Sequence, residues 1–138
     1  MTDVAVVLDT SALLGYAHGL LAVGELIAEV SHERRHVGIP AACLARARAA
    51  VPDEYGAAQL VLLTTSPTVV VLPLGADEIG RADPLWQVGD LARAAGGDLA
   101  TGHAVHAVLA HGAYYATTEP ARPAGVLPAR WGILDLGA

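Results

Sequence analysis

Three acidic residues, far apart in the sequence, stand at the ends of segments that predict regular structure. Asp9 directly follows a valine-rich strand segment, Asp98 opens a helical segment, and Glu119 follows a second strand segment. We expect these positions to meet at one rim of a sheet, where crowded carboxylates repel one another unless a cation lies between them. Mg²⁺ and Mn²⁺ prefer such oxygen ligands and can activate water to attack a phosphodiester. The three acids therefore predict a divalent-metal site.

Each of these acids also has an ordinary structural explanation. Asp9 and Asp98 can act as N-caps of the helices that follow them, since an acid is favoured at that end of a helix. Glu119 can be a solvated loop residue. The functional interpretation therefore depends on whether folding brings the three side chains into one pocket.

The hydropathy pattern predicts strands that alternate with helices. Short apolar runs predict strands over residues 4–8, 36–39, 69–72, 113–117 and 131–136. Helices are predicted over residues 12–14, 20–35, 41–50, 52–63, 77–95 with an interruption at Asp83-Pro84, and 98–111. Thr10 or Ser11 is expected to cap the first helix. This alternation predicts an α/β fold, a three-layer α/β/α sandwich with a central, mainly parallel sheet.

The composition narrows the possible functions. The chain has 138 residues, 54% of them hydrophobic and 16% charged, which predicts one folded domain over residues 1–138. All eight basic residues are arginine, so reactions that need a lysine amine, such as Schiff-base chemistry, are excluded. The formal charge of −6 argues against a broadly basic nucleic-acid surface but leaves room for local arginine patches.

The sequence also predicts the cellular setting. Its first residues lack the pattern of a signal peptide, and no apolar run approaches the roughly 18 residues of a membrane span. The single cysteine, Cys43, has no partner for an internal disulfide and is expected to be buried and inert. We therefore expect a cytoplasmic protein with no membrane partner.

Four segments, taken together, resemble the motifs of one family. They are Val6-Val7-Leu8-Asp9-Thr10-Ser11-Ala12-Leu13-Leu14, Ile39-Pro40-Ala41-Ala42-Cys43-Leu44-Ala45-Arg46-Ala47, Asp98-Leu99-Ala100-Thr101-Gly102-His103 and Tyr115-Ala116-Thr117-Thr118-Glu119-Pro120. In this order and at these distances they resemble the PIN-domain ribonucleases, which include the VapC-type toxins, along essentially the whole chain. The fourth motif usually ends in aspartate, where this chain has Glu119.

The resemblance implies roles for the matching residues. The catalytic carboxylates that would hold Mg²⁺ or Mn²⁺ are Asp9, Asp98 and Glu119. The residues that would orient them by hydrogen bonds are Thr10, Ser11, Thr117 and His103. The second motif departs from the family, because it usually supplies a glutamate where this chain has Arg46. Arginine cannot ligate a metal, so an inward-pointing Arg46 would neutralise part of the acidic charge and lower the affinity for divalent ions. An outward-pointing Arg46 would leave Asp9, Asp98 and Glu119 to bind the ion together with waters.

Two functions follow from the resemblance. The leading hypothesis is a metal-dependent endoribonuclease like the VapC-type toxins, with RNA as substrate and, by resemblance, a homodimeric state and a small antitoxin protein as partner. The alternative is a catalytically degenerate PIN-like domain that binds RNA or protein. A third possibility, a phospho-acceptor receiver domain, places Asp9 correctly after the first strand but lacks the lysine and the second neighbouring acid of that chemistry.

Overall fold

The computed structural model describes residues 2–137, and its centre is a five-stranded sheet. The strands are β1 (Val4–Leu8), β2 (His36–Pro40), β3 (Val69–Leu72), β4 (Tyr114–Thr117) and β5 (Ile133–Asp135). They lie in the order β3-β2-β1-β4-β5, and every neighbouring pair is parallel. The predicted α/β fold with a central parallel sheet is therefore confirmed.

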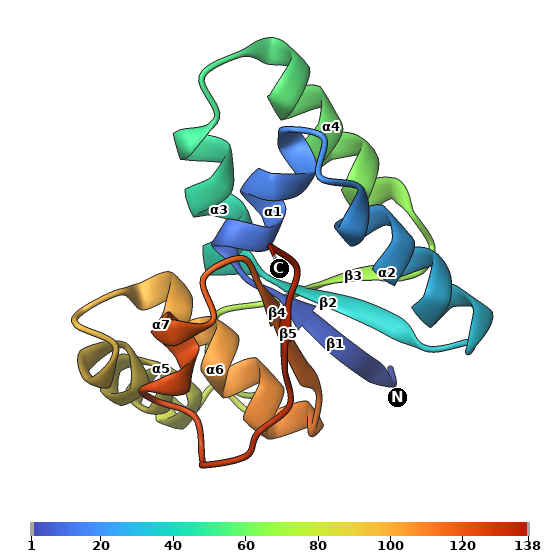
Figure 1. Ribbon diagram of the computed structural model, residues 1–138. Coiled ribbons are helices and arrows are strands. Elements are labelled where there is room, and N and C mark those ends of the chain that lie inside the picture. Colours follow the sequence, from blue (N-terminus) through green and yellow to red (C-terminus); the bar gives the residue numbers. More distant parts are fainter. Residues whose placement is uncertain (1, 138) are drawn as a thin grey trace.

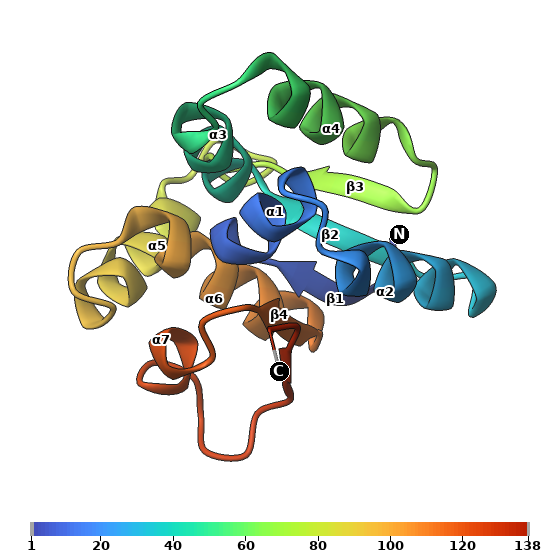
Figure 2. The same cartoon turned by 45° about the horizontal axis from the view of Figure 1, so that its top comes forward.

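Helices cover both faces of this sheet (Figures 1 and 2). They are α1 (Thr10–Ala17), α2 (Leu21–His32), α3 (Ala41–Ala50), α4 (Glu54–Thr65), α5 (Asp83–Ala94), α6 (Leu99–His111) and α7 (Ala121–Ala124). Helices α1, α2 and α4 lie together on one side, whereas α5 and α6 pack against each other on the opposite side (Figure 2). Helix α3 contacts both α1 and α6, so it joins the two helical layers beside the ends of the strands.

The first strand occupies the middle of the core because it is apolar on both faces. All five residues of β1 are buried, and Val7 pairs with Gly38 on one side and with Tyr115 on the other. A strand covered on both faces has no solvent side, so its sequence is a continuous apolar run instead of an alternating one. Asp9 comes directly after this run, which places it at the carboxyl edge of the sheet.

Several element ends differ from the sequence prediction by one to three residues, and the main departures concern α1, α5 and α7. Helix α1 begins at Thr10 and its cap is Asp9, so the N-cap interpretation of Asp9 is confirmed and the expected cap at Thr10 or Ser11 is wrong. Helix α5 begins only at Asp83, because the Asp77 side chain accepts hydrogen bonds from two backbone N–H groups of the preceding loop, those of Ile79 and Arg81. The short helix α7 was not predicted at all.

The helices of the described region are short relative to a bilayer. No single helix within residues 2–137 combines the length and the apolar composition needed to cross a membrane. The pair α1 and α2 meets both criteria only when the two are counted together, across a bend of 109°.

Candidate functional site

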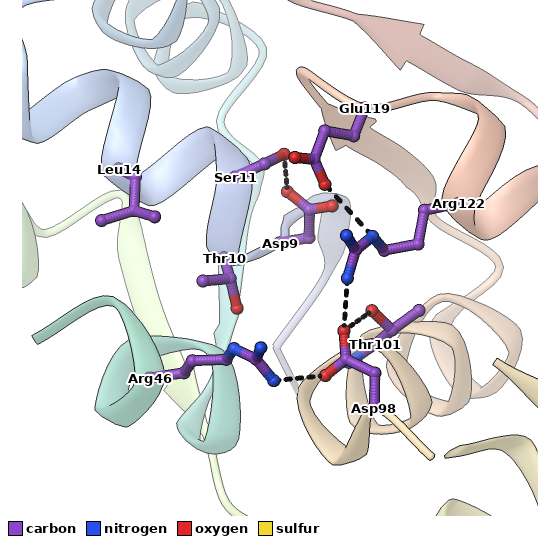
Figure 3. Close-up of a pocket in the computed structure, with 9 residues that line it drawn as sticks. All are labelled: Asp9, Thr10, Ser11, Leu14, Arg46, Asp98, Thr101, Glu119 and Arg122. Atoms are coloured by element: carbon purple, nitrogen blue, oxygen red, sulfur yellow. Dashed lines mark hydrogen bonds and ion pairs between the residues drawn. The ribbon is translucent and has the colours of Figure 1, made fainter. Parts of the chain in front are cut away.

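Asp9 is held rigidly at the end of the central strand. It is 4% exposed, and its Oδ1 accepts hydrogen bonds from the Ser11 hydroxyl at 2.7 Å and from the Ala12 N–H at 3.0 Å. The second of these bonds makes Asp9 the N-cap of α1. The other carboxylate oxygen points toward the part of the pocket that carries Glu119 and Arg122 (Figure 3).

A hydroxyl pair supports Asp9 from the neighbouring strand. Ser11 Oγ lies 2.9 Å from Thr117 Oγ1 and accepts the Thr118 N–H at 2.9 Å. Because the Ser11 hydrogen is donated to Asp9, the Thr117 hydroxyl donates to Ser11. Thr117 Oγ1 in turn accepts the Glu119 N–H at 2.9 Å. Ser11 thus bonds Asp9 directly, and Thr117 is connected to Asp9 through Ser11.

Asp98 caps the other helix of the site. Its Oδ1 accepts the N–H groups of Ala100 at 3.1 Å and Thr101 at 3.4 Å, which makes it the N-cap of α6. Its Oδ2 accepts the Thr101 hydroxyl at 2.7 Å. The carboxylate is therefore fixed at the first turn of α6, facing the end of β1.

Two arginines also bind this carboxylate. Arg46 Nη1, on α3, lies 2.9 Å from Asp98 Oδ1, and Arg122 Nη1, on α7, lies 2.9 Å from Asp98 Oδ2. Arg122 also places its Nε 3.1 Å from Glu119 Oε2, so it bridges two of the three acids. Arg46 thus points inward, which is the orientation that the sequence analysis linked to weak metal affinity.

Folding brings these side chains into one cavity of about 150 Å³ (Figure 3). The residues that line it are Asp9, Thr10, Ser11, Leu14, Arg46, Asp98, Thr101, Glu119 and Arg122. They come from the ends of β1 and β4 and from the helices α1, α3, α6 and α7. The predicted convergence of Asp9, Asp98 and Glu119 is therefore present, although it includes two guanidinium groups.

The pKa values of Asp9 and Asp98 are shifted in opposite directions. Burial raises the pKa of Asp9 above its ordinary value, and the hydrogen bonds from Ser11 and Ala12 offset only part of that effect. Burial also opposes ionisation of Asp98, but hydrogen bonds from Thr101 and Arg122, together with the charge of Arg46, outweigh it and lower the pKa of that group. Of the two carboxylates, Asp98 is the one held firmly in its charged form.

The donor arrangement around Asp98 does not suit a divalent ion. A carboxylate offers about four lone-pair positions, and Asp98 already accepts from the two arginines, the Thr101 hydroxyl and two backbone N–H groups. Within residues 2–137, no group of three or more His, Cys, Asp or Glu side chains is arranged to hold a metal ion. The carboxylates have the right chemistry for Mg²⁺ or Mn²⁺, but the oxygens of Asp98 are committed to other donors.

The remaining predicted residues lie near the site in different ways. Thr10 lines the cavity, and its hydroxyl is buried without a hydrogen-bond partner in the described part of the chain. His103 is 3% exposed and lies outside the cavity lining, where its Nδ1 accepts the Ala42 N–H at 3.3 Å. It therefore joins α6 to the start of α3. Cys43 is buried as expected, and its burial raises the pKa of the thiol to about 12.

Arg122 is the charged residue of the cavity that sequence reasoning missed, besides the uncharged Leu14 and Thr101. Its only local signal is the spacing Glu119-Pro120-Ala121-Arg122, which places an acid just before, and a base within, a short helix whose N-cap is Pro120. The contact with Asp98 is tertiary, since 24 residues separate the two. No periodicity in the sequence could have predicted that contact.

Comparisons with known proteins do not assign the chain to a family. The chain matches no model of a known protein family, and no curated protein matches it either. The PIN-domain resemblance therefore stays a prediction that rests on the four motifs, and the structure adds a parallel α/β sheet with the three acids at its carboxyl edge.

Proposed function

We propose that this chain is a catalytically degenerate PIN-like domain that binds single-stranded RNA without cleaving it through a divalent metal. The observation that carries the proposal is that Arg46 and Arg122 each form an ion pair with one carboxylate oxygen of Asp98. Three carboxylates line the pocket, as a metal-dependent hydrolytic site would require, but guanidinium groups contact two of them. Binding to nucleic acid then depends on the arginines.

The mixture of donors and acceptors in the pocket suits a nucleotide better than a free phosphate. The side chains of Arg46 and Arg122 are 56% and 47% exposed, so part of each guanidinium reaches the pocket mouth, where it can contact phosphate oxygens. Asp9 directs one carboxylate oxygen into the pocket, where it can accept a hydrogen bond from a ribose hydroxyl (Figure 3). A 2′-hydroxyl is what distinguishes RNA from DNA at such a position.

Fluorescence anisotropy with a labelled single-stranded RNA in EDTA tests this proposal. We expect the wild type to bind RNA more tightly than DNA of the same sequence, with an affinity that decreases as salt increases. Arg46→Gln and Arg122→Gln should each weaken RNA binding, by on the order of tenfold, because each removes a charged phosphate contact.

The chain provides matched controls for both substitutions. Arg48 lies on α3 close to Arg46 in sequence, and Arg93 lies on α5; both are exposed and outside the pocket lining. Arg48→Gln and Arg93→Gln remove the same charge but should leave RNA binding within about twofold of the wild type. Equal losses in all four variants would mean that binding follows net charge and not the pocket, and the proposal would fail.

A second function, the metal-dependent endoribonuclease of the VapC type, is favoured by the convergence of Asp9, Asp98 and Glu119 in one cavity. Cleavage of single-stranded RNA with Mn²⁺ or Mg²⁺ tests it, with Asp9→Asn as the comparison. Cleavage that needs the ion and disappears in Asp9→Asn would establish this function, whereas equal background in both proteins would remove it. The homodimer and the small antitoxin partner implied by the resemblance belong to this second function and stay predictions.

A further inference from the structure

Arg122 lies between two acids that come from different parts of the chain. Helix α7 begins four residues after the end of β4, and Arg122 on this helix reaches back to Glu119 through Nε and across to Asp98 through Nη1 (Figure 3). Asp98 is only 13% exposed, so its charge is poorly solvated and depends on these partners. The two ends of one guanidinium thus hold Glu119 and Asp98 together.

We propose that Arg122 is a built-in counterion that excludes divalent cations from this pocket, and that it does so more strongly than Arg46. The three acids carry a formal charge of −3 and the two arginines +2, which leaves −1 in the cavity. A divalent ion that enters must displace a guanidinium or share the acids with it, at close range to a positive charge. The inference deepens the metal-free part of the proposed function.

The contacts make the two arginines unequal. Arg46 contacts one acid, at Oδ1 of Asp98, an oxygen that the first turn of α6 also occupies. Arg122 contacts two acids and takes one oxygen from each, Oδ2 of Asp98 and Oε2 of Glu119. Removing Arg122 therefore leaves Glu119 Oε2 without a donor among the described residues and Asp98 Oδ2 with the Thr101 hydroxyl alone. Removing Arg46 leaves Asp98 Oδ1 still bonded to two backbone N–H groups.

Mn²⁺ binding to the whole protein without RNA tests this inference, measured by electron paramagnetic resonance of the free ion and by titration calorimetry. We expect weak binding by the wild type and by the control Arg93→Gln. Arg122→Gln should bind Mn²⁺ on the order of tenfold more tightly than the wild type, because the cavity charge changes from −1 to −2 and two acids each lose a guanidinium contact. Arg46→Gln, with the same change in charge, should gain less, and the double variant should bind most tightly.

Two results would overturn the inference. One is a wild type that already binds Mn²⁺ within about twofold of Arg122→Gln, and the other is an Arg46→Gln variant that gains as much as Arg122→Gln. If Arg122→Gln does not fold, Arg122→Lys replaces it, because lysine keeps the charge but cannot bridge two carboxylates in the same way. Arg122→Lys should bind Mn²⁺ more tightly than the wild type, but by less than the tenfold expected for Arg122→Gln. An affinity equal to that of the wild type would also contradict the inference.

The experiment is independent of RNA binding. A protein that excludes Mn²⁺ as expected but binds no RNA would overturn the proposed RNA-binding function and leave this inference standing. A protein that binds RNA through Arg46 and Arg122 but also binds Mn²⁺ tightly would overturn the inference alone. The two proposals therefore fail separately.

Discussion

Ser11 Oγ and Thr117 Oγ1 lie 2.9 Å apart, although 106 residues separate them in the sequence. This contact joins the first turn of α1 to the last residue of β4, and so fixes the distance between Asp9 and the segment that carries Glu119 and Arg122. The geometry of the pocket therefore depends on a pair of neutral hydroxyls as much as on its charged groups.

Replacing Thr117 by valine should lower stability. Thr117 is fully buried, so the Glu119 N–H and the Ser11 hydroxyl lose a partner without regaining water, at a cost of about 1–3 kcal/mol. Urea unfolding measures this change. Thr65→Val is the control, because Thr65 is exposed at the end of α4, and it should change the free energy of unfolding by less than about 0.5 kcal/mol.

The close packing of α5 against Gly102 leads to a second prediction about stability. A Cβ at this position of α6 would lie 2.6 Å from the Ala92 backbone nitrogen and 2.7 Å from the Val88 carbonyl oxygen of α5. Gly102→Ala should therefore destabilise the protein by roughly 1–3 kcal/mol, since backbone cannot move aside cheaply. Gly89→Ala, on α5 with no atom near its added Cβ, should instead stabilise by about 0.5–1 kcal/mol. Equal effects of the two substitutions in thermal unfolding would contradict the close packing of α5 on α6.

The charged form of Asp9 should make the protein less stable at neutral pH than at the acidic pH where Asp9 is protonated. Its folded pKa is raised by burial, so the folded protein holds the proton more tightly than the unfolded chain does. The free energy of unfolding therefore falls as pH rises from the unfolded value of about 3.9 through the higher folded pKa. Asp9→Asn, which keeps an acceptor for Ser11 and Ala12, should raise the melting temperature at pH 7 by about 3 °C or more.

The advantage of Asp9→Asn should shrink as pH falls toward the unfolded pKa, because the native carboxyl is then protonated too. Asp53→Asn is the comparison, since Asp53 caps α4 in the same way but is exposed. A gain for Asp53→Asn as large as that for Asp9→Asn would show that burial of Asp9 is not the cause.

His103 predicts the opposite pH dependence. Burial lowers its pKa, and the neutral ring accepts the Ala42 N–H at the start of α3. Above the unfolded pKa of about 6.5, the contribution of His103 to the free energy of unfolding should not change with pH. Below that pH the free energy of unfolding should decrease until the lower folded pKa is reached. Thermal unfolding between pH 7.5 and 5 measures the slope. His103→Gln should reduce the slope, and an unchanged slope would assign the effect to other groups.

The sequence predicted the order of the elements well, because each major strand is a compact apolar run between turn residues. It also predicted that Asp9, Asp98 and Glu119 would share a pocket, since the carboxyl ends of neighbouring parallel strands lie at one edge. It left the first cap open because Asp9, Thr10 and Ser11 are all good capping residues and stand side by side, and the structure assigns it to Asp9.

Other features of the structure could not be predicted from the sequence, for physical reasons. The segment before α5 looked helical, but side-chain bonds from Asp77 to the backbone hold it in a turn. Helix α7 is one turn long and has no periodicity to detect. The direction of Arg46 and the reach of Arg122 to Asp98 depend on how three helices meet, which local pattern does not specify.

Asp9 and Asp98 each complete the first turn of a helix, whatever else they do in the pocket. Loss of either side chain would weaken the fold before it affected any ligand. A descendant of an active enzyme would therefore keep a capping side chain, aspartate or asparagine, at both positions under pressure from folding alone, long after its chemistry had gone. A capping side chain at these two positions is evidence of architecture, and the residues that report on activity are the less constrained ones opposite them, Arg46 and Arg122.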